Sequence, residues 1–188
     1  MHALIIFASG KGSNAQAIID HFKITKQAKV ALIVSNKADA AVLEIARAEH
    51  IPFLIVDKLS FREPLFLEQL QSYNPSLIVL AGFLWKLPAQ LIEAYPHRII
   101  NVHPALLPNY GGKGMYGNFV HEAVLSAKEQ ESGITIHYVN EVYDSGNIIL
   151  QARCSVEKDD DNVSLANKIH KLEHFFYPKT VEYLLKQL

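Results

Sequence analysis

The sequence lacks several features that would place it in a specialised class of protein. Its one cysteine, Cys154, can form neither an internal disulfide nor a thiolate metal cluster, which indicates a reducing compartment. No apolar run approaches the roughly 18 residues of a membrane span, and the first residues have no basic start of a signal peptide. The 18 basic and 19 acidic residues leave a net charge of −1, so there is no broad basic field for nucleic acid. We therefore predict a cytoplasmic protein whose partners are neither membranes nor nucleic acids.

The composition that is present suits one well-packed domain, since 49% of the 188 residues are hydrophobic. In the first hundred residues, short apolar runs alternate with stretches of helical periodicity. The runs are almost unbroken, which indicates strands buried on both faces of a sheet. They lie at residues 3–7, 30–34, 53–56, 77–81 and 98–102. We predict an α/β fold with a doubly wound, mostly parallel, Rossmann-like sheet.

Helices are predicted between these strands and after them. The expected helices are residues 13–22, residues 40–49, a third from a capping box at 60–63 to residue 73, and a fourth with Pro88 as its first residue. Beyond residue 108 the pattern predicts a helix at 118–126, a hairpin of residues 133–139 and 147–156, and a solvated acidic loop at 158–161. A long C-terminal helix is expected from about 164 to 185, kinked or broken by Pro178.

A glycine-containing loop follows the first strand, with the sequence Ser-Gly-Lys-Gly-Ser-Asn at residues 9–14. Ligands bind at this place in a doubly wound sheet, because the loop amides and the helix N-terminus attract anions. Ser13 and Asn14 can donate further hydrogen bonds, so we predict a monophosphate site. A dinucleotide site is the alternative, but no acidic residue follows the second strand at residues 35–37. A tight turn without a ligand also stays open.

Two polar side chains mark the end of the fifth strand. Asn101 and His103 are two residues apart, so in an extended chain both project to the same side, and Pro104 then ends the strand. Asp144 lies in a turn at residues 141–146. Taken singly, the histidine would be a half-exposed residue and the aspartate part of an Asx-turn. Together, an amide, an imidazole and a carboxylate suit acyl transfer, with an oxyanion donor, a proton carrier and its partner.

The other residues of these loops constrain the chemistry further. No nucleophilic serine or cysteine stands beside His103, so direct transfer is favoured over an acyl-enzyme. His137 shares a strand face with Thr135, and the sequence leaves open whether it lines the site or packs in the core. The histidines outside these segments have no metal-ligand spacing, and we predict no metal site.

Several motifs, in order along the chain, are similar to those of a known family. The chain resembles the phosphoribosylglycinamide formyltransferases, folate-dependent enzymes of purine biosynthesis, over essentially its whole length. The matching segments are residues 9–14, 81–83, 100–108 and 133–146, and Glu173-His174 before Tyr177-Pro178. Methionyl-tRNA formyltransferases and formyltetrahydrofolate hydrolases share an Asn, His and Asp core of this type, but they are longer. The resemblance implies one formyltransferase domain over 1–188, with a nucleotide-phosphate-binding half at 1–102. Residues 103–188 would supply the catalytic loop, the folate-binding hairpin and the C-terminal helix.

The resemblance also implies a reaction. The formyl group of 10-formyltetrahydrofolate, a co-substrate consumed in each turnover, would pass to the amine of glycinamide ribonucleotide. Asn101 and protonated His103 would stabilise the tetrahedral oxyanion, while Asp144 raises the pKa of His103 and helps to pass a proton. No tightly bound cofactor is implied. The partners are these two small molecules, and the chain is expected to be a monomer or a weak homodimer.

Two binding sites follow from the same resemblance. Gly12, Ser13 and Asn14 would hold the substrate phosphate, and Glu173 its ribose. Arg62 would reach the glutamate tail of the folate or a nearby carboxylate. The full set of implied folate contacts is Arg62, Leu84, Trp85, Lys86, Leu87, Asn101, Val142 and Tyr143.

Three features depart from the family pattern. Trp85 stands where many members have arginine, and Lys86 is the expected substitute at the folate tail. Asn147 replaces a frequent proline. The glycine-rich loop at 111–117 is longer than the shortest family version and is expected to be a mobile flap. The Leu107–Pro108 bond is also expected to be cis.

Other functions stay open at this point. In a formyltetrahydrofolate hydrolase, water would replace the amine. A non-catalytic module could sense a phosphorylated metabolite through residues 9–14, which would leave Asn101, His103 and Asp144 without a role. A formyltransferase that acts on a nucleotide-linked sugar amine is the third alternative.

Overall fold

Seven strands form a single sheet in the order β3-β2-β1-β4-β5-β6-β7 in the computed structural model, which describes residues 1–188. The strands are β1 (His2–Phe7), β2 (Ala28–Ser35), β3 (Phe53–Ile55), β4 (Leu77–Leu80), β5 (Ile99–His103), β6 (Glu131–Tyr138) and β7 (Ile148–Ser155). The first five are parallel to one another, whereas β6 and β7 form an antiparallel hairpin on the edge of β5. The predicted sheet class and hairpin are therefore confirmed.

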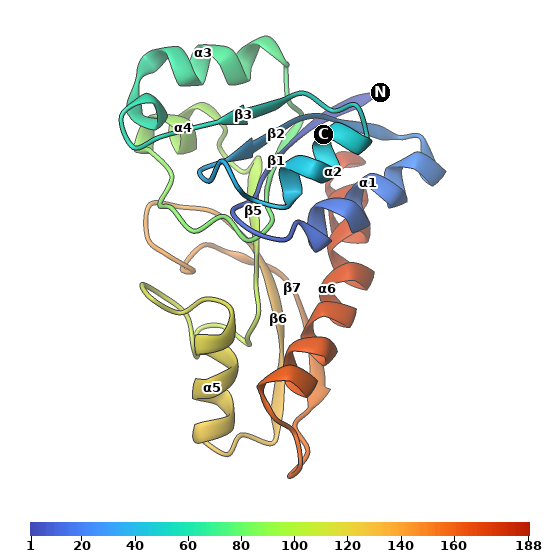
Figure 1. Cartoon of the computed structure of the whole chain (residues 1–188), viewed down its shortest axis with the longest axis vertical. Helices are drawn as coiled ribbons and strands as arrows, with labels where there is room; N and C mark the ends of the chain where they lie inside the picture. The colour runs from blue at the N-terminus through green and yellow to red at the C-terminus, as the bar shows by residue number, and fades with distance from the viewer.

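Helices cover both faces of the sheet (Figure 1). They are α1 (Ser13–Thr25), α2 (Val42–Ala48), the 3-10 turn η1 (Ser60–Arg62), α3 (Pro64–Ser72), α4 (Ala89–Ala94), α5 (Asn118–Ser126) and α6 (Asn162–Leu185). One core lies under α1, α2, α5 and α6, and the other lies under η1, α3 and α4. Strand β1 serves both cores, because Leu4 and Ile6 face the first, Ile5 and Phe7 face the second, and none of them is exposed. The unbroken apolar runs thus mark strands buried on both faces.

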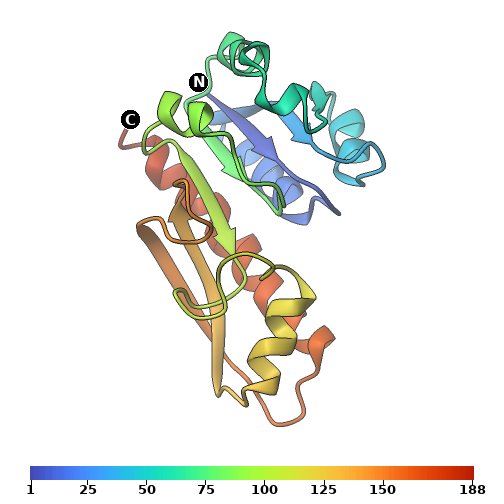
Figure 2. The same ribbon diagram turned by 90° about the vertical axis from the view of Figure 1, so that its left-hand side faces the viewer.

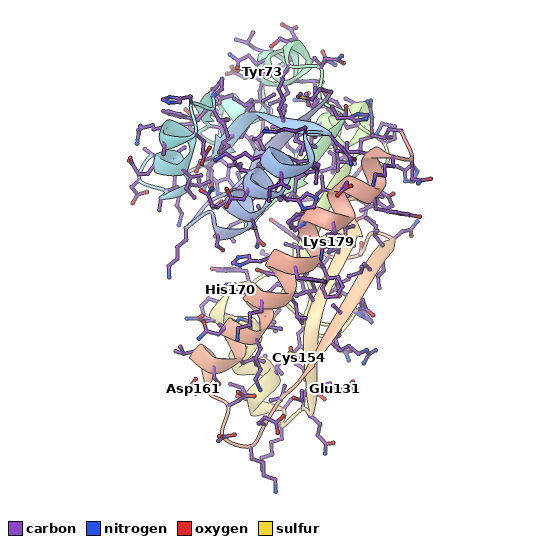
Figure 3. All side chains as sticks on the ribbon, turned by 90° about the vertical axis from the view of Figure 1, so that its right-hand side faces the viewer. Tyr73, Glu131, Cys154, Asp161, His170 and Lys179 are labelled. Atoms are coloured by element: carbon purple, nitrogen blue, oxygen red, sulfur yellow. The ribbon has the colours of Figure 1, made fainter.

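The molecule divides into two ends that are joined by β5 and α6 (Figure 2). The parallel strands with α1 to α4 make up one end, and β6, β7 and α5 make up the other. Strand β5 runs from one end toward the other in both views, and the segment that follows it leads into α5. Figure 3 shows His170 part-way along α6, where the two ends meet.

The prediction for the C-terminal helix needs two corrections. Helix α6 begins at Asn162 and runs without interruption to Leu185, so Pro178 does not break it. Burial of the preceding Tyr177, whose hydroxyl donates to the carbonyl of Leu80 at 2.9 Å, helps to offset the backbone hydrogen bond that proline cannot make. The acidic loop is also more than a solvated segment. Asp161 caps the helix in a capping box with Ser164.

Two other helix starts differ from the predictions. The expected capping box at residues 60–63 does not form, because Ser60–Arg62 is a 3-10 turn and α3 begins at Pro64. The side chain of Asp57 accepts hydrogen bonds from the backbone N–H groups of Leu59 and Ser60 instead. Pro88 precedes α4 as its N-cap rather than serving as its first residue. The Leu107–Pro108 bond is cis, as predicted.

Candidate active site

A cavity of about 700 Å³ lies at the carboxyl ends of β1, β4 and β5. This is where doubly wound sheets bind their ligands. It is lined by the loop at residues 9–14, by residues 80–87, 101–104, 112–117 and 142–144, and by Ile169, His170 and Glu173 of α6. The cavity therefore reaches from the glycine-containing loop to the turn that carries Asp144.

The glycine-containing loop adopts a conformation that requires glycine at residue 12. Gly12 has a φ of 78° and precedes the first residue of α1, so Ser13 and Asn14 lie in the first turn of the helix. A Cβ atom at residue 12 would come within 2.7 Å of Val42 Cγ2. The loop amides and the helix dipole face the cavity together, which suits an anion.

Ser9 is a buried anchor of this loop that the sequence did not single out. Its hydroxyl donates to Asn36 Oδ1 at 2.6 Å and accepts from the backbone N–H of Leu84 at 3.1 Å. Ser9 thus ties the end of β1 to the residues after β2 and β4. These two hydrogen bonds fix the position of the anion end of the cavity relative to the segment at residues 84–87.

Asn14 and Glu173, which are far apart in the sequence, meet at the same end of the cavity. The amide Nδ2 of Asn14 donates to Glu173 Oε2 at 2.9 Å. Glu173 is 6% exposed, and burial raises the pKa of its carboxyl group to about 7 against the opposing effect of the Asn14 hydrogen bond. A ligand with hydroxyl groups would find an acceptor here.

Asn101 and His103 project from the end of β5, as the two-residue spacing predicted. His103 is 3% exposed. Its Nε2 lies 2.7 Å from the carbonyl oxygen of Tyr110, and a carbonyl can only accept, so Nε2 carries a proton. Nδ1 then faces Asp144 Oδ2 at 3.5 Å. The neutral ring presents a lone pair toward the carboxylate, and protonation at Nδ1 converts this contact into an ion pair.

The protonated His103 expected during the reaction is not the form that the ligand-free site favours. Burial lowers the pKa of His103, and this effect outweighs Asp144 and the Tyr110 hydrogen bond, which raise the pKa. The neutral ring therefore predominates at pH 7. Asp144 does favour the charged form, as predicted, but it does not overcome desolvation.

Asp144 is held in place as a carboxylate. Its φ is 54°, in the left-handed region, and Oδ2 accepts a hydrogen bond from the backbone N–H of Gly112 at 2.9 Å. Burial acts to raise the pKa of Asp144. The His137 and His103 rings, when they carry a proton toward the carboxylate, and the Gly112 N–H lower that pKa overall. The site thus keeps a buried negative charge beside His103.

His137 belongs to this site, which settles the alternative that the sequence left open. Strand β6 pairs with β5 so that His137 lies opposite Asn101. Its Nδ1 donates to the carbonyl of Tyr138 at 2.9 Å, so its Nε2 accepts from Asn101 Nδ2 at 3.2 Å. One N–H of the Asn101 amide is held in this way, and the second is free for a ligand. The cross-strand register, which the sequence does not specify, makes this contact.

The residues expected to contact folate divide into two groups. Leu84, Trp85, Lys86, Leu87, Val142 and Tyr143 all line the cavity, whereas Arg62 is exposed and lies outside the lining. The Trp85 ring stacks edge-on against Phe61 and Phe83, with centroid distances of 5.7 and 6.3 Å. Trp85 is therefore part of an aromatic cluster as well as a wall of the cavity.

Comparison with known proteins places the chain in a family. A family model described as formyl transferase matches residues 2–181. The chain belongs to the formyl transferase family. It is 38% identical over 191 residues to the phosphoribosylglycinamide formyltransferase of Bacillus subtilis, covering 98% of this chain and 95% of that protein. It is 40% identical over 186 residues to a chloroplastic phosphoribosylglycinamide formyltransferase of Arabidopsis thaliana, covering 95% of this chain and 63% of that longer relative.

Solved structures agree with this membership. The glycinamide ribonucleotide transformylase 1 of Symbiobacterium toebii has a TM-score of 0.91 and 31% identity, covering 100% of this chain and 89% of that one. A formyltetrahydrofolate deformylase of Pseudomonas syringae has a TM-score of 0.88 but 20% identity, covering 99% of this chain and 62% of that one, so it shows the fold alone. No helix has both the length and the apolar character needed to cross a membrane.

Proposed function

We propose that this member of the formyl transferase family is a phosphoribosylglycinamide formyltransferase of purine biosynthesis. It transfers the formyl group of 10-formyltetrahydrofolate to the amine of glycinamide ribonucleotide. The observation that carries the proposal is that Asn101, His103 and Asp144 line one cavity that also contains two distinct binding surfaces. An anion site forms one end, and a largely apolar wall forms the other.

The anion end suits a phosphorylated ribose. The amides of Gly12, Ser13 and Asn14 bind the phosphate, while the buried Glu173 accepts hydrogen bonds from ribose hydroxyls. With a pKa of about 7, this carboxyl group can be neutral when it contacts the ribose, and burying a neutral group costs less than burying a charge. The substrate amine then extends toward Asn101 and His103.

The opposite end suits the flat, partly apolar ring system of a folate. Leu84, Leu87, Val142 and Tyr143 supply apolar contact, and Lys86 lies on the same segment as a cation for a carboxylate. Since Arg62 lies outside the lining, we propose Lys86 as the main cationic contact for the folate tail. Trp85 stiffens this wall through its aromatic neighbours.

The proposed chemistry is direct transfer with one proton carrier. The substrate nitrogen attacks the formyl carbon, and the free N–H of Asn101 stabilises the oxyanion that forms. Neutral His103 takes a proton from the attacking nitrogen at Nδ1, and Asp144, 3.5 Å away, stabilises the imidazolium. His103 then gives the proton to N10 of the folate as the carbon–N10 bond breaks. The products are the formylated amine and tetrahydrofolate.

The test is the release of tetrahydrofolate, followed by absorbance, with and without glycinamide ribonucleotide. We expect release only when the nucleotide is present. Equal release without it would make the protein a hydrolase, and no release under either condition would favour a phosphometabolite-binding module. A run with nucleotide-linked sugar amines in place of glycinamide ribonucleotide tests the remaining alternative, which predicts faster release with those amines.

A further inference from the structure

A hydrogen-bond network lies behind the segment that follows β5, on the side away from the active-site cavity. We call residues 104–110 the catalytic loop. The Thr135 hydroxyl donates to the carbonyl of Ala105 at 2.7 Å and accepts from the N–H of Leu107 at 3.0 Å. Gln151, on β7, donates through Nε2 to the carbonyl of Leu107 and to Thr135 Oγ1, both at 2.9 Å.

This network uses every hydrogen-bonding position of the Thr135 hydroxyl and both donors of the Gln151 amide. A threonine hydroxyl has one donor and two acceptor sites, and all three are filled here, as are both N–H groups of the Gln151 amide. Thr135 has no exposed surface. A network paired in this way, around a buried hydroxyl, restrains the backbone that it binds. The middle of the catalytic loop is therefore fixed from β7.

The two ends of the catalytic loop together hold His103. The residue itself ends β5, and its Nε2 donates to the carbonyl of Tyr110 at the far end of the loop. A shift of the loop thus changes both the ring orientation and the approach of Nδ1 to Asp144. We propose that Gln151 is a positioning residue for His103, acting through the backbone of the catalytic loop. The expected effect of Gln151 on turnover rests on the proposed function.

Gln151 has no direct access to the substrates. It does not line the active-site cavity but a separate cavity of about 250 Å³, together with Leu107, Tyr110 and Arg153. An effect of residue 151 on turnover must therefore pass through the loop. The charged and titratable groups facing His103 are Asp144 from its turn and His137 from β6, and residue 151 alters neither directly.

The variant Gln151→Met keeps the length of the side chain and removes both donors. We expect kcat to fall about tenfold, with the KM of each substrate changed less than twofold. The substitution should loosen the contacts of His103 with Tyr110 and Asp144. Since both contacts raise the pKa of His103, that pKa should fall. The acid limb of the kcat profile should then move to lower pH, which a purely structural loss of stability would not produce.

Arg153→Met is the matched control. Arg153 lies two residues along the same strand and lines the same small cavity, but its partner is the exposed Glu131 and not the catalytic loop. We expect Arg153→Met to have the kcat of the wild type and an unchanged acid limb in its pH profile of kcat. Gln151→Glu is similar in size but cannot donate hydrogen bonds as a carboxylate. Its kcat should fall at least as far as that of Gln151→Met, and it serves as a second variant if Gln151→Met does not fold.

Titration of the His103 ring by NMR separates the positioning role of Gln151 from the proposed formyl transfer. A lowered His103 pKa in Gln151→Met but not in Arg153→Met supports the positioning role, even if the wild type transfers no formyl group. An unchanged His103 pKa, or equal loss of kcat in Gln151→Met and Arg153→Met, would overturn it. Inactivity of the wild type with both substrates counts against the proposed function alone.

Discussion

Replacing Asp144 by asparagine isolates the carboxylate charge beside His103. The substitution keeps the side-chain size, and asparagine tolerates the left-handed φ of 54° better than most residues. Its amide oxygen can still accept from the N–H of Gly112, which now bonds to Oδ2 at 2.9 Å. The fold should therefore persist, and the change should fall on the stability of the imidazolium.

The magnitude follows from the distance between the two groups. Unit charges 3.5 Å apart attract by about 5 kcal/mol at an effective dielectric constant of about 20. The imidazolium is only partly formed in the transition state, and we expect roughly 60 to 85% of this energy, about 2.7 to 4.1 kcal/mol, to be lost. Since 1.36 kcal/mol is a factor of ten, kcat for Asp144→Asn should fall about 100- to 1000-fold.

The assay is steady-state tetrahydrofolate formation with both substrates saturating, with thermal unfolding measured in parallel. Asp159→Asn is the matched control, because it removes one negative charge from an exposed loop position. It should leave kcat unchanged. A kcat for Asp144→Asn within about threefold of the wild type, with the folding intact, would refute the assignment of Asp144 as the partner of the imidazolium.

Two further outcomes are expected at the anion end of the cavity. Gly12→Ala should raise the KM for glycinamide ribonucleotide at least tenfold and lower the melting temperature, because its Cβ would press on Val42 at 2.7 Å. Gly10→Ala is the control and should do neither, because a Cβ there meets nothing within 4 Å. Equal effects of the two substitutions would count against the loop geometry. Glu173 has a pKa of about 7 in the folded protein, above its ordinary value of 4.5. The contribution of its neutral carboxyl group to stability is therefore complete below about pH 4.5 and is lost as the pH rises through 7. The loss is about 3 kcal/mol, and Glu173→Gln should flatten the fall in unfolding free energy between pH 5 and pH 8 in urea titrations; an unaltered pH dependence would contradict the buried carboxyl.

Local patterns predicted much of the fold and the centre of the site. Unbroken apolar runs identified the parallel strands, and the spacing of Asn101 and His103 placed both at one strand end. These inferences depend only on the two-residue period of a strand and on where parallel strands end. They required no knowledge of distant contacts.

The features that the sequence did not predict depend on cross-strand register and on burial. His137 contacts Asn101, and Gln151 reaches the catalytic loop, only because β6 and β7 pair in a particular register beside β5. The lowered pKa of His103 is a balance between desolvation and a nearby carboxylate, and a motif shows the carboxylate but not the desolvation. Pro178 continues a helix because tertiary packing around Tyr177 outweighs the local preference.

In the proposed function, Asn101, His103 and Asp144 pass a formyl group directly between two bound substrates. The most direct measurement uses folate labelled with ¹³C in the formyl group together with glycinamide ribonucleotide, and identifies the labelled product by mass spectrometry. Direct transfer predicts the label in the formylated amine, in an amount equal to the tetrahydrofolate formed. Label recovered as formate, with the nucleotide unmodified, would contradict it.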